Sequence, residues 1–374
     1  TLALDISVPA QPEYLWEHLG PTTYDEVDYT AMGYSVSRPV ITNLYDRTEP
    51  HDRWTVIWGS GRAVPYASSV DYYKSSEPNL YFHHISDDYL NSYYDAVDFD
   101  RAGINIHPEP GSSVNLDTDS SYEYGYISGA VSAVDIDSDG DSDVIYFPVT
   151  VSYDPSSGVS EIADPGHTWF YKAVIDTTDL DNPEWCEFVD PNDYVEDRHE
   201  VYYASTTAWH NDGSLGVYWG TGSPYDRLNS DPGYVFGFID EAPTTCPATA
   251  TPICTGGYLE MDEGEGLTGN PIAYQGVVYF PTYTPNEDRC ENGLGKIRGM
   301  SYNTCEGGID SDGDGEADAE YVETDGYPSS ITITDQGEVI WGSSSFDNDS
   351  NFSTMSVVAD PFKGTRTMMI REVF

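Results

Sequence analysis

The chain contains a nine-residue acidic stretch, residues 135–143, whose residue types and spacing suit a metal ion. Carboxylates at its positions 1, 3, 5 and 9 can fold around one hard cation, and position 7 can add a backbone carbonyl. Gly140 at position 6 permits the sharp turn that such a loop needs. We therefore predict a calcium site here, with the candidate residues Asp135, Asp137, Asp139, Asp141 and Asp143.

A second acidic stretch, residues 310–318, repeats this spacing, with Gly315 at position 6 and Glu316 offering its backbone carbonyl at position 7. Either stretch alone could be an acidic, solvated turn, but two copies in one chain favour calcium. The sequence thus predicts two Ca²⁺ sites, whose role is structural or regulatory. The candidates in the second loop are Asp310, Asp312, Asp314, Glu316 and Asp318.

Neither a helical pattern nor an acidic twelfth residue accompanies the first loop, where Tyr146 holds that position. The loop is therefore not an EF-hand, and apolar extended runs on both sides predict that it joins two strands.

These runs belong to a repeat that occurs five times: an extended run, an apolar strand often ending in Gly, and an aromatic-rich strand. The fifth copy places its third strand at residues 367–373. A fourth strand follows several copies, at residues 184–189, 258–261 and 317–322. The copies begin at Ser37, Gly129, Ser205, Gly269 and Pro328.

Four-stranded sheets in series, without a helical pattern, predict an all-β fold, a β-propeller of four-stranded antiparallel blades. Residues 2–6 and 12–17 form the last strands of a split blade whose earlier strands lie upstream, so we expect six or seven blades. Long insertions at residues 62–78, 86–126 and 240–257 decorate the faces. We expect one domain over residues 1–374, the C-terminal part of a larger precursor.

The amino-acid composition of the chain excludes several classes of protein. The 374 residues include 65 Asp and Glu against 15 Lys and Arg, a net charge of −50, which repels nucleic acid. The 31 Tyr, 8 Trp and 12 Phe residues exclude a disordered chain. No apolar run reaches the length of a membrane span. Such an acidic, aromatic-rich chain is typical of a secreted protein.

Five cysteines are present, and none has the spacing of a metal site. Cys290 with Cys305, and Cys246 with Cys254, could form disulfides, which would leave Cys186 unpaired. Disulfides would suit an oxidising compartment.

Several segments, in their order along the chain, carry a family resemblance. They are Leu2–Ile6 followed by Tyr14–Glu17, Met32–Ile41, Trp54–Gly61, Ser132–Tyr146, Val217–Gly222, Gly276–Pro285 with Cys290, and Arg366–Val373. Together they resemble the C-terminal propeller domain of the PilC/PilY family, the type IV pilus tip-associated adhesins and pilus biogenesis factors. Ile370 stands where the family has Trp, and the second acidic loop cannot be attributed to the family.

The resemblance implies an extracellular, cell-surface protein at a pilus tip or filament, with calcium at Asp135, Asp137, Asp139 and Asp143 tuning pilus behaviour or adhesion. Its expected partners are pilus or other surface-filament proteins, further copies of itself, and a host or abiotic surface. A structural subunit of an extracellular filament or surface layer is the alternative.

Enzymatic motifs are absent from the sequence: we find no G-x-S-x-G, no P-loop and no H-E-x-x-H. A quinoprotein dehydrogenase, a class related to the family's propeller, would often have adjacent cysteines, which this chain lacks. We therefore predict that the chain is not an enzyme.

Overall fold

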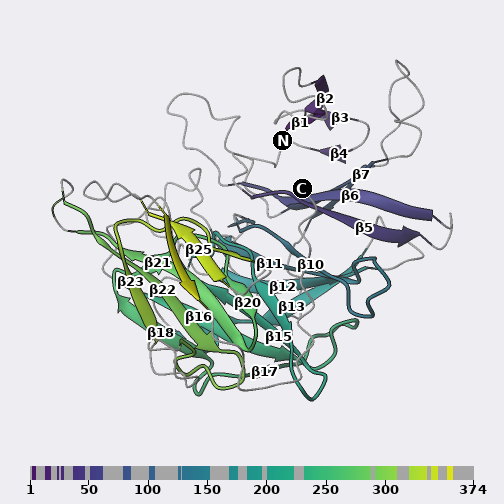
Figure 1. Ribbon diagram of the computed structural model, residues 1–374. Coiled ribbons are helices and arrows are strands. Elements are labelled where there is room, and N and C mark those ends of the chain that lie inside the picture. Colours follow the sequence, from purple (N-terminus) through teal and green to yellow (C-terminus); the bar gives the residue numbers. More distant parts are fainter. Residues whose placement is uncertain are drawn as a thin grey trace, which may run out of the picture. The chain divides into compact units, whose positions relative to one another are not determined.

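The fold is given by a computed structural model (Figure 1). It describes residues 2–5, 13–17, 23–24, 27–28, 37–46, 51–61, 79–85, 101–105, 125–127, 129–151, 168–175, 183–195, 200–222, 231–286, 288, 291–309, 320–334, 338–343 and 352–356. Within these residues, no helix has the length and apolarity that a membrane span requires.

The described strands fall into two compact units, the first comprising residues 1–128, 149–165 and 176–183. Its largest sheet, which we call the first blade, is antiparallel in the order β5-β6-β7-β8. Those strands are Val40–Asp46, His51–Gly59, Asn79–Ile85 and Arg101–Asn105. The smaller pairs are β1 (Leu2–Asp5) with β2 (Glu13–Glu17), and β3 (Thr23–Tyr24) with β4 (Val27–Asp28). β9 (Gly125–Tyr126) pairs with the end of β11.

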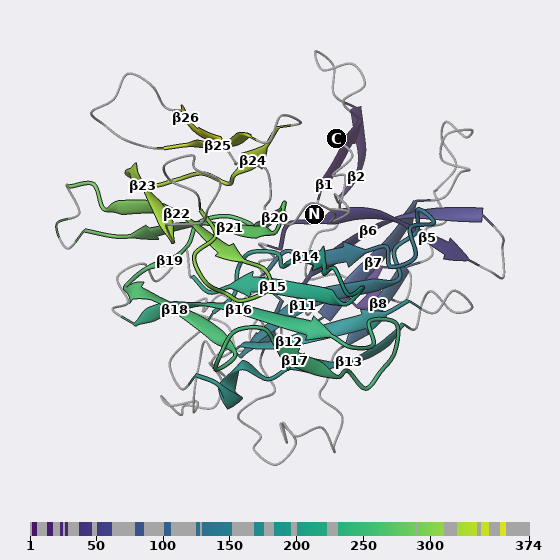
Figure 2. The same ribbon diagram turned by 60° about the horizontal axis from the view of Figure 1, so that its bottom comes forward.

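The second unit comprises residues 129–148, 166–175 and 184–374, and its antiparallel sheets define four further blades (Figure 2). The second blade contains β10 (Ser132–Val134), β11 (Val144–Val151), β12 (Thr168–Val174) and β13 (Glu184–Val189), with a 3₁₀ turn at Pro191–Asp193. The third contains β14 (Thr206–Trp209), β15 (Leu215–Gly220), β16 (Pro232–Asp240), β17 (Ala250–Pro252) and β18 (Tyr258–Glu263). The fourth contains β19 (Gly266–Leu267), β20 (Ile272–Tyr274), β21 (Val277–Thr284), β22 (Leu294–Ser301) and β23 (Tyr321–Asp325). The fifth contains β24 (Thr332–Ile333), β25 (Glu338–Gly342) and β26 (Phe352–Ser356).

The predicted repeats are confirmed as these five sheets, and residues 2–5 pair with residues 13–17 as the split blade requires. Two details were wrong. The partner that β25 takes in the fifth blade is Phe352–Ser356, whereas the predicted strand at residues 367–373 lies outside the described residues. Two predicted insertions contain strands, β8 and β17, because their backbone groups complete the edges of neighbouring sheets. The single domain and the blade count stay predictions.

A large aromatic residue occupies the same place on the second long strand of every blade and is followed by Gly or Pro. All five side chains are buried: Trp58, Phe147, Trp219, Phe280 and Trp341. In the second unit, Trp219 stacks on Phe170 of the second blade with ring centroids 4.1 Å apart. One apolar cluster therefore joins the second and third blades through face-to-face aromatic packing.

The third and fourth blades approach each other at a glycine. The backbone N–H of Leu267 donates to the carbonyl of Thr221 (2.9 Å), and the N–H of Gly222 donates to the carbonyl of Glu200 (2.9 Å). A Cβ atom on Gly222 would lie 2.5 Å from the backbone nitrogen of Leu267. Only glycine allows this approach, because both contacting segments are hydrogen-bonded backbone that cannot turn aside.

We expect Gly222→Ala to lower the free energy of unfolding by about 3 kcal/mol, the upper part of the usual range for overpacking. Gly220→Ala is the matched control, since its Cβ would meet the side chain of Leu267, which can move. Adding Leu267→Ala should relieve Gly220→Ala but not Gly222→Ala. Chemical denaturation measures all four variants, and equal stability of Gly222→Ala and the unaltered chain would contradict this account of the joint.

Two disulfides connect the blades of the second unit. Cys186 on β13 bonds Cys246 in the β16–β17 connection, and Cys254 bonds Cys305 beyond β22. The predicted pairs were therefore wrong, and Cys186 is not unpaired. Cys246 and Cys254 are close in sequence and both belong to the third blade, but each bonds a cysteine of a neighbouring blade, so the bonded pairs are 60 and 51 residues apart. Cys290 lies outside the described residues.

Candidate metal centre

The first acidic loop is the connection of the β10–β11 hairpin, as predicted. Val134 pairs with Val144, so the nine loop residues begin and end at adjacent points of the sheet. The N–H of Asp143 donates to the carbonyl of Val134 (2.9 Å), and the carbonyl of Asp143 accepts from Ile175 just beyond β12 (2.8 Å). Both backbone groups of Asp143 are therefore fixed by the second blade.

The loop backbone folds back on its own first carboxylate. Asp135 accepts the N–H of Ser138 on Oδ1 (2.6 Å) and the N–H of Gly140 on Oδ2 (2.9 Å). This wrapping requires positive φ angles of 66° at Ser138 and 107° at Gly140. Glycine adopts such an angle at little cost, so the Gly at position 6 has the role that its spacing predicted.

Three carboxylates converge in this loop: ligand oxygens of Asp135, Asp137 and Asp143 all lie within 4.8 Å of one another. Burial, and then the charges of Asp137 and Asp135, raise the pKa of Asp143, against the lowering effect of the Ile136 N–H that donates to its Oδ2 (2.7 Å). Carboxylate oxygens are the donors that hard divalent cations prefer, and a cation would offset this mutual repulsion. The three residues thus fit a metal ion.

Asp139, predicted as the ligand at position 5, is not a member of this group, and its role as a ligand stays a prediction. Its Oδ1 instead accepts the N–H of Asp141 (3.0 Å), a local turn that holds the side chain along the loop. Asp141 is outside the group as well, and its role through the backbone carbonyl stays a prediction. Residues 310–318 lie outside the described residues, so the second site stays a prediction.

A carboxylate that the sequence analysis did not single out lies within the last strand of the second blade, opposite Tyr171. Glu187 on β13 has one oxygen, Oε2, without a hydrogen-bond partner among the described residues. Burial, followed by the charges of Asp190 and Asp193, raises the pKa of Glu187 to about 7. The spacing of Glu187, Asp190 and Asp193 along the sequence does not indicate that Glu187 is buried, because its burial arises only when the chain folds.

This pKa predicts a pH dependence of stability. The folded chain holds a proton on Glu187 that the unfolded chain releases near pH 4.5, so stability should fall as pH rises from about 4.5 to 7. Glu187→Gln should therefore raise the melting temperature at pH 8 and leave it nearly unchanged at pH 4. Glu184→Gln, at an exposed position of the same strand, is the control. Thermal melts at both pH values test this, and an equal effect of Glu187→Gln at each would contradict it.

No family model matches the chain, and no curated protein matches it. Among solved structures, it is similar to the C-terminal domain of PilY1 from Pseudomonas aeruginosa, with a TM-score of 0.53 and 17% identity over 92% of this chain and 76% of that one. The chain has a fold like that of the PilY1 C-terminal domain. This likeness confirms the β-propeller class and agrees with the resemblance seen in the sequence.

Enzymes are also among the similar structures. The polysaccharide lyase Uly1 has a TM-score of 0.36 and 10% identity over 89% of this chain and 62% of that one. A levansucrase from B. megaterium has a TM-score of 0.36 and 10% identity over 84% of each chain. The prediction that the chain is not an enzyme was wrong, because missing sequence motifs do not exclude catalysis and enzymes are among the similar structures.

Proposed function

We propose that this chain is an extracellular calcium-binding propeller that acts in type IV pilus-associated surface adhesion or pilus biogenesis. The observation that carries the proposal is the convergence of Asp135, Asp137 and Asp143 in a hairpin loop of a PilY1-like propeller. The loop offers only oxygen ligands on a backbone that is already folded around them, which favours calcium over softer metals.

The proposed calcium ion fixes the β10–β11 hairpin. Asp143 is held by the sheet on one side, and Asp135 is held by loop amides on the other. An ion bound between them would join the two ends of the loop through the three carboxylates, in addition to the hydrogen bonds that already hold it. Calcium concentration outside the cell would then set how firmly this face of the second blade is held.

An extracellular location is supported by two disulfides, which persist in oxidising compartments. The proposed partners are pilus or other surface-filament proteins, further copies of the chain, and a host or abiotic surface. The net charge of −50 favours partners that present cations or that associate in the presence of salt.

Immunogold electron microscopy of native cell-surface material, with antibody to this chain, tests the location. We expect label at filament ends, and loss of surface attachment when calcium is chelated. Regular label along filaments would overturn the tip role and indicate a structural subunit. Label confined to the cell interior would overturn the extracellular proposal altogether.

A further inference from the structure

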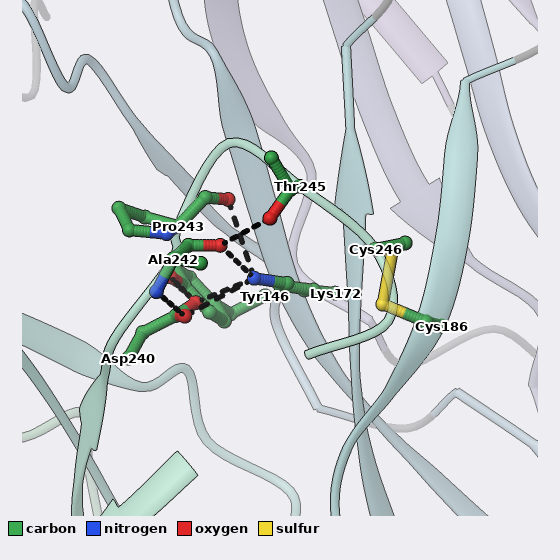
Figure 3. Close-up of a disulfide and its surroundings, with 8 residues drawn as sticks. All are labelled: Tyr146, Lys172, Cys186, Asp240, Ala242, Pro243, Thr245 and Cys246. Atoms are coloured by element: carbon green, nitrogen blue, oxygen red, sulfur yellow. Dashed lines mark hydrogen bonds and ion pairs between the residues drawn. A yellow bond between two sulfur atoms is a disulfide. The ribbon is translucent and has the colours of Figure 1, made fainter. Parts of the chain in front are cut away.

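A lysine lies fully buried between the second and third blades, beside the Cys186–Cys246 disulfide (Figure 3). Lys172 is on β12, and its Nζ lies 2.9 Å from Oδ2 and 3.1 Å from Oδ1 of Asp240, at the end of β16. Both side chains are 0% exposed. The remaining contacts of Nζ are the carbonyls of Ala242 (2.7 Å) and Pro243 (3.4 Å).

The carboxyl group of Asp240 also receives two neutral donors. The hydroxyl of Tyr146 donates to Oδ2 (2.7 Å), and the backbone N–H of Ala242 donates to Oδ1 (3.1 Å). Donors aimed at a carbonyl oxygen polarise it and stabilise the oxyanion that forms when a nucleophile attacks the carbon. Asp240 is thus a carboxyl group placed beside a primary amine, and Tyr146 donates to Oδ2, the oxygen on which an oxyanion would form if Oδ1 left.

The surroundings disfavour charge. Tyr146 belongs to the apolar cluster between the second and third blades, whose buried members near this end include Phe238 and Phe188. Burial lowers the pKa of Lys172, against the opposing effect of Asp240. A desolvated amine is a stronger nucleophile, because more of it carries a free electron pair.

We propose that Lys172 and Asp240 form an intramolecular isopeptide bond, a covalent amide between the second and third blades. One proton passes from the ammonium group to the carboxylate, and the amine electron pair then attacks Cγ of Asp240. The bond from Cγ to Oδ1 breaks, and Oδ1 leaves as water with two protons that began on Nζ. The product is neutral: Nζ keeps one proton for the Ala242 carbonyl, and Oδ2 becomes an amide oxygen that accepts from Tyr146.

The fold supplies the driving force for this dehydration. The reacting groups come from strands 68 residues apart, and holding them together replaces an encounter in solution by a step of high effective molarity. The reaction also removes a buried ion pair, whose desolvation is costly. Water produced there is released from an apolar core that offers it few partners.

The neighbouring disulfide favours the same encounter. Lys172 and Cys186 are directly opposed on β12 and β13, so their side chains leave the same face of the sheet. Their partners, Asp240 and Cys246, both belong to the chain that leaves β16. Closing the disulfide therefore holds Asp240 near the amine, and the amide would make a second covalent link across the same junction.

Intact-mass spectrometry of the reduced, denatured chain tests the proposal directly. We expect a mass below that of the reduced sequence by one water molecule, and a branched peptide joining the segments around Lys172 and Asp240 after proteolysis. A mass equal to that of the reduced sequence, with separate linear peptides, would overturn the proposal and leave an ion pair. This measurement needs no variant, so a folding defect cannot obscure it.

Three variants identify the atoms that form the proposed amide bond. Lys172→Arg retains a buried cation but should show no mass loss, since guanidinium is a poor nucleophile. Asp240→Asn should lose ammonia instead and reach the same final mass as the cross-linked natural chain. Tyr146→Phe, which removes one donor to Oδ2, should slow formation at least tenfold in a time course after refolding. Mass loss that persists in Lys172→Arg would place the bond elsewhere and overturn the assignment.

Discussion

We expect a Glu265→Gln variant to unfold with a free energy about 3–5 kcal/mol below that of the unaltered chain, because it removes the central charge of a buried network. Glu265 accepts from the Nε (2.6 Å) and Nη2 (2.7 Å) of Arg298 and from Nζ of Lys296 (3.1 Å). Both cations are on β22 and almost fully buried. Glutamine keeps the shape of the side chain, so the loss measures two buried cations whose remaining carboxylate partner is the exposed Asp262. Urea denaturation at neutral pH gives the value.

Asp262→Asn is the matched control for this network. Asp262 pairs with the same lysine but is 65% exposed, so water already screens its charge. We expect a change of no more than about 1 kcal/mol. If the two variants were equally destabilised, burial would not explain the contribution of Glu265 to the free energy of unfolding.

The Glu265 network also sets how the chain responds to acid. Burial by itself would raise the pKa of Glu265, but the hydrogen bonds and charge of Arg298 outweigh it and lower this pKa from 4.5 to about 2. The stabilisation is therefore complete above pH 4.5 and lost as pH falls towards 2. The stability difference between Glu265→Gln and the unaltered chain should shrink over that range. A difference that stays constant from pH 7 to pH 2.5 would contradict the ionised state of Glu265.

The blades could be predicted from the sequence because each is built from local hydrogen-bonded neighbours. The pattern of an aromatic residue followed by Gly or Pro, seen at Trp58, Trp219 and Trp341, marks the second long strand wherever it occurs. Such strands pair with the next strand along the chain, so most of the strand order follows from the pattern, whereas β8, β17 and the third strand of the fifth blade were missed. The fold class could therefore be predicted from local sequence patterns, without knowledge of the contacts between blades.

Contacts between blades could not be predicted in this way. Cys186 and Cys246, like Lys172 and Asp240, meet only because the second and third blades pack face to face. Nothing near either residue in sequence distinguishes it from an exposed cysteine or lysine. The cluster that buries Lys172 is assembled from β11, β12 and β16, and therefore exists only in the folded chain.

The metal loop could be predicted from the sequence only in part. Its position and its turn at Gly140 follow from nine consecutive residues, but the carboxylates that face inward depend on the backbone. Asp143 is directed by the Ile136 amide, whereas Asp139 is used by a turn with Asp141. Spacing identifies which residues are available for a metal ion, and local hydrogen bonds decide which of them are used.

That distinction predicts opposite effects of one substitution with and without calcium. Asp143→Asn removes a charge that burial and Asp137 disfavour, so the calcium-free variant should melt above the calcium-free natural chain. In calcium at about 100 times the dissociation constant, the natural chain should gain about 2.7 kcal/mol from this loop and the variant much less. The order of the two melting temperatures should therefore reverse.

Asp139→Asn separates this effect from a general change of charge. It removes one negative charge from the same loop but no member of the three-carboxylate group, so most of the calcium-dependent gain should remain. Calorimetric titration should likewise lose one calcium site in Asp143→Asn and none in Asp139→Asn, while any ion held by residues 310–318 stays in both. If Asp139→Asn abolished the gain as fully as Asp143→Asn, the ion would be bound by position 5, and the loop would close differently when calcium enters it.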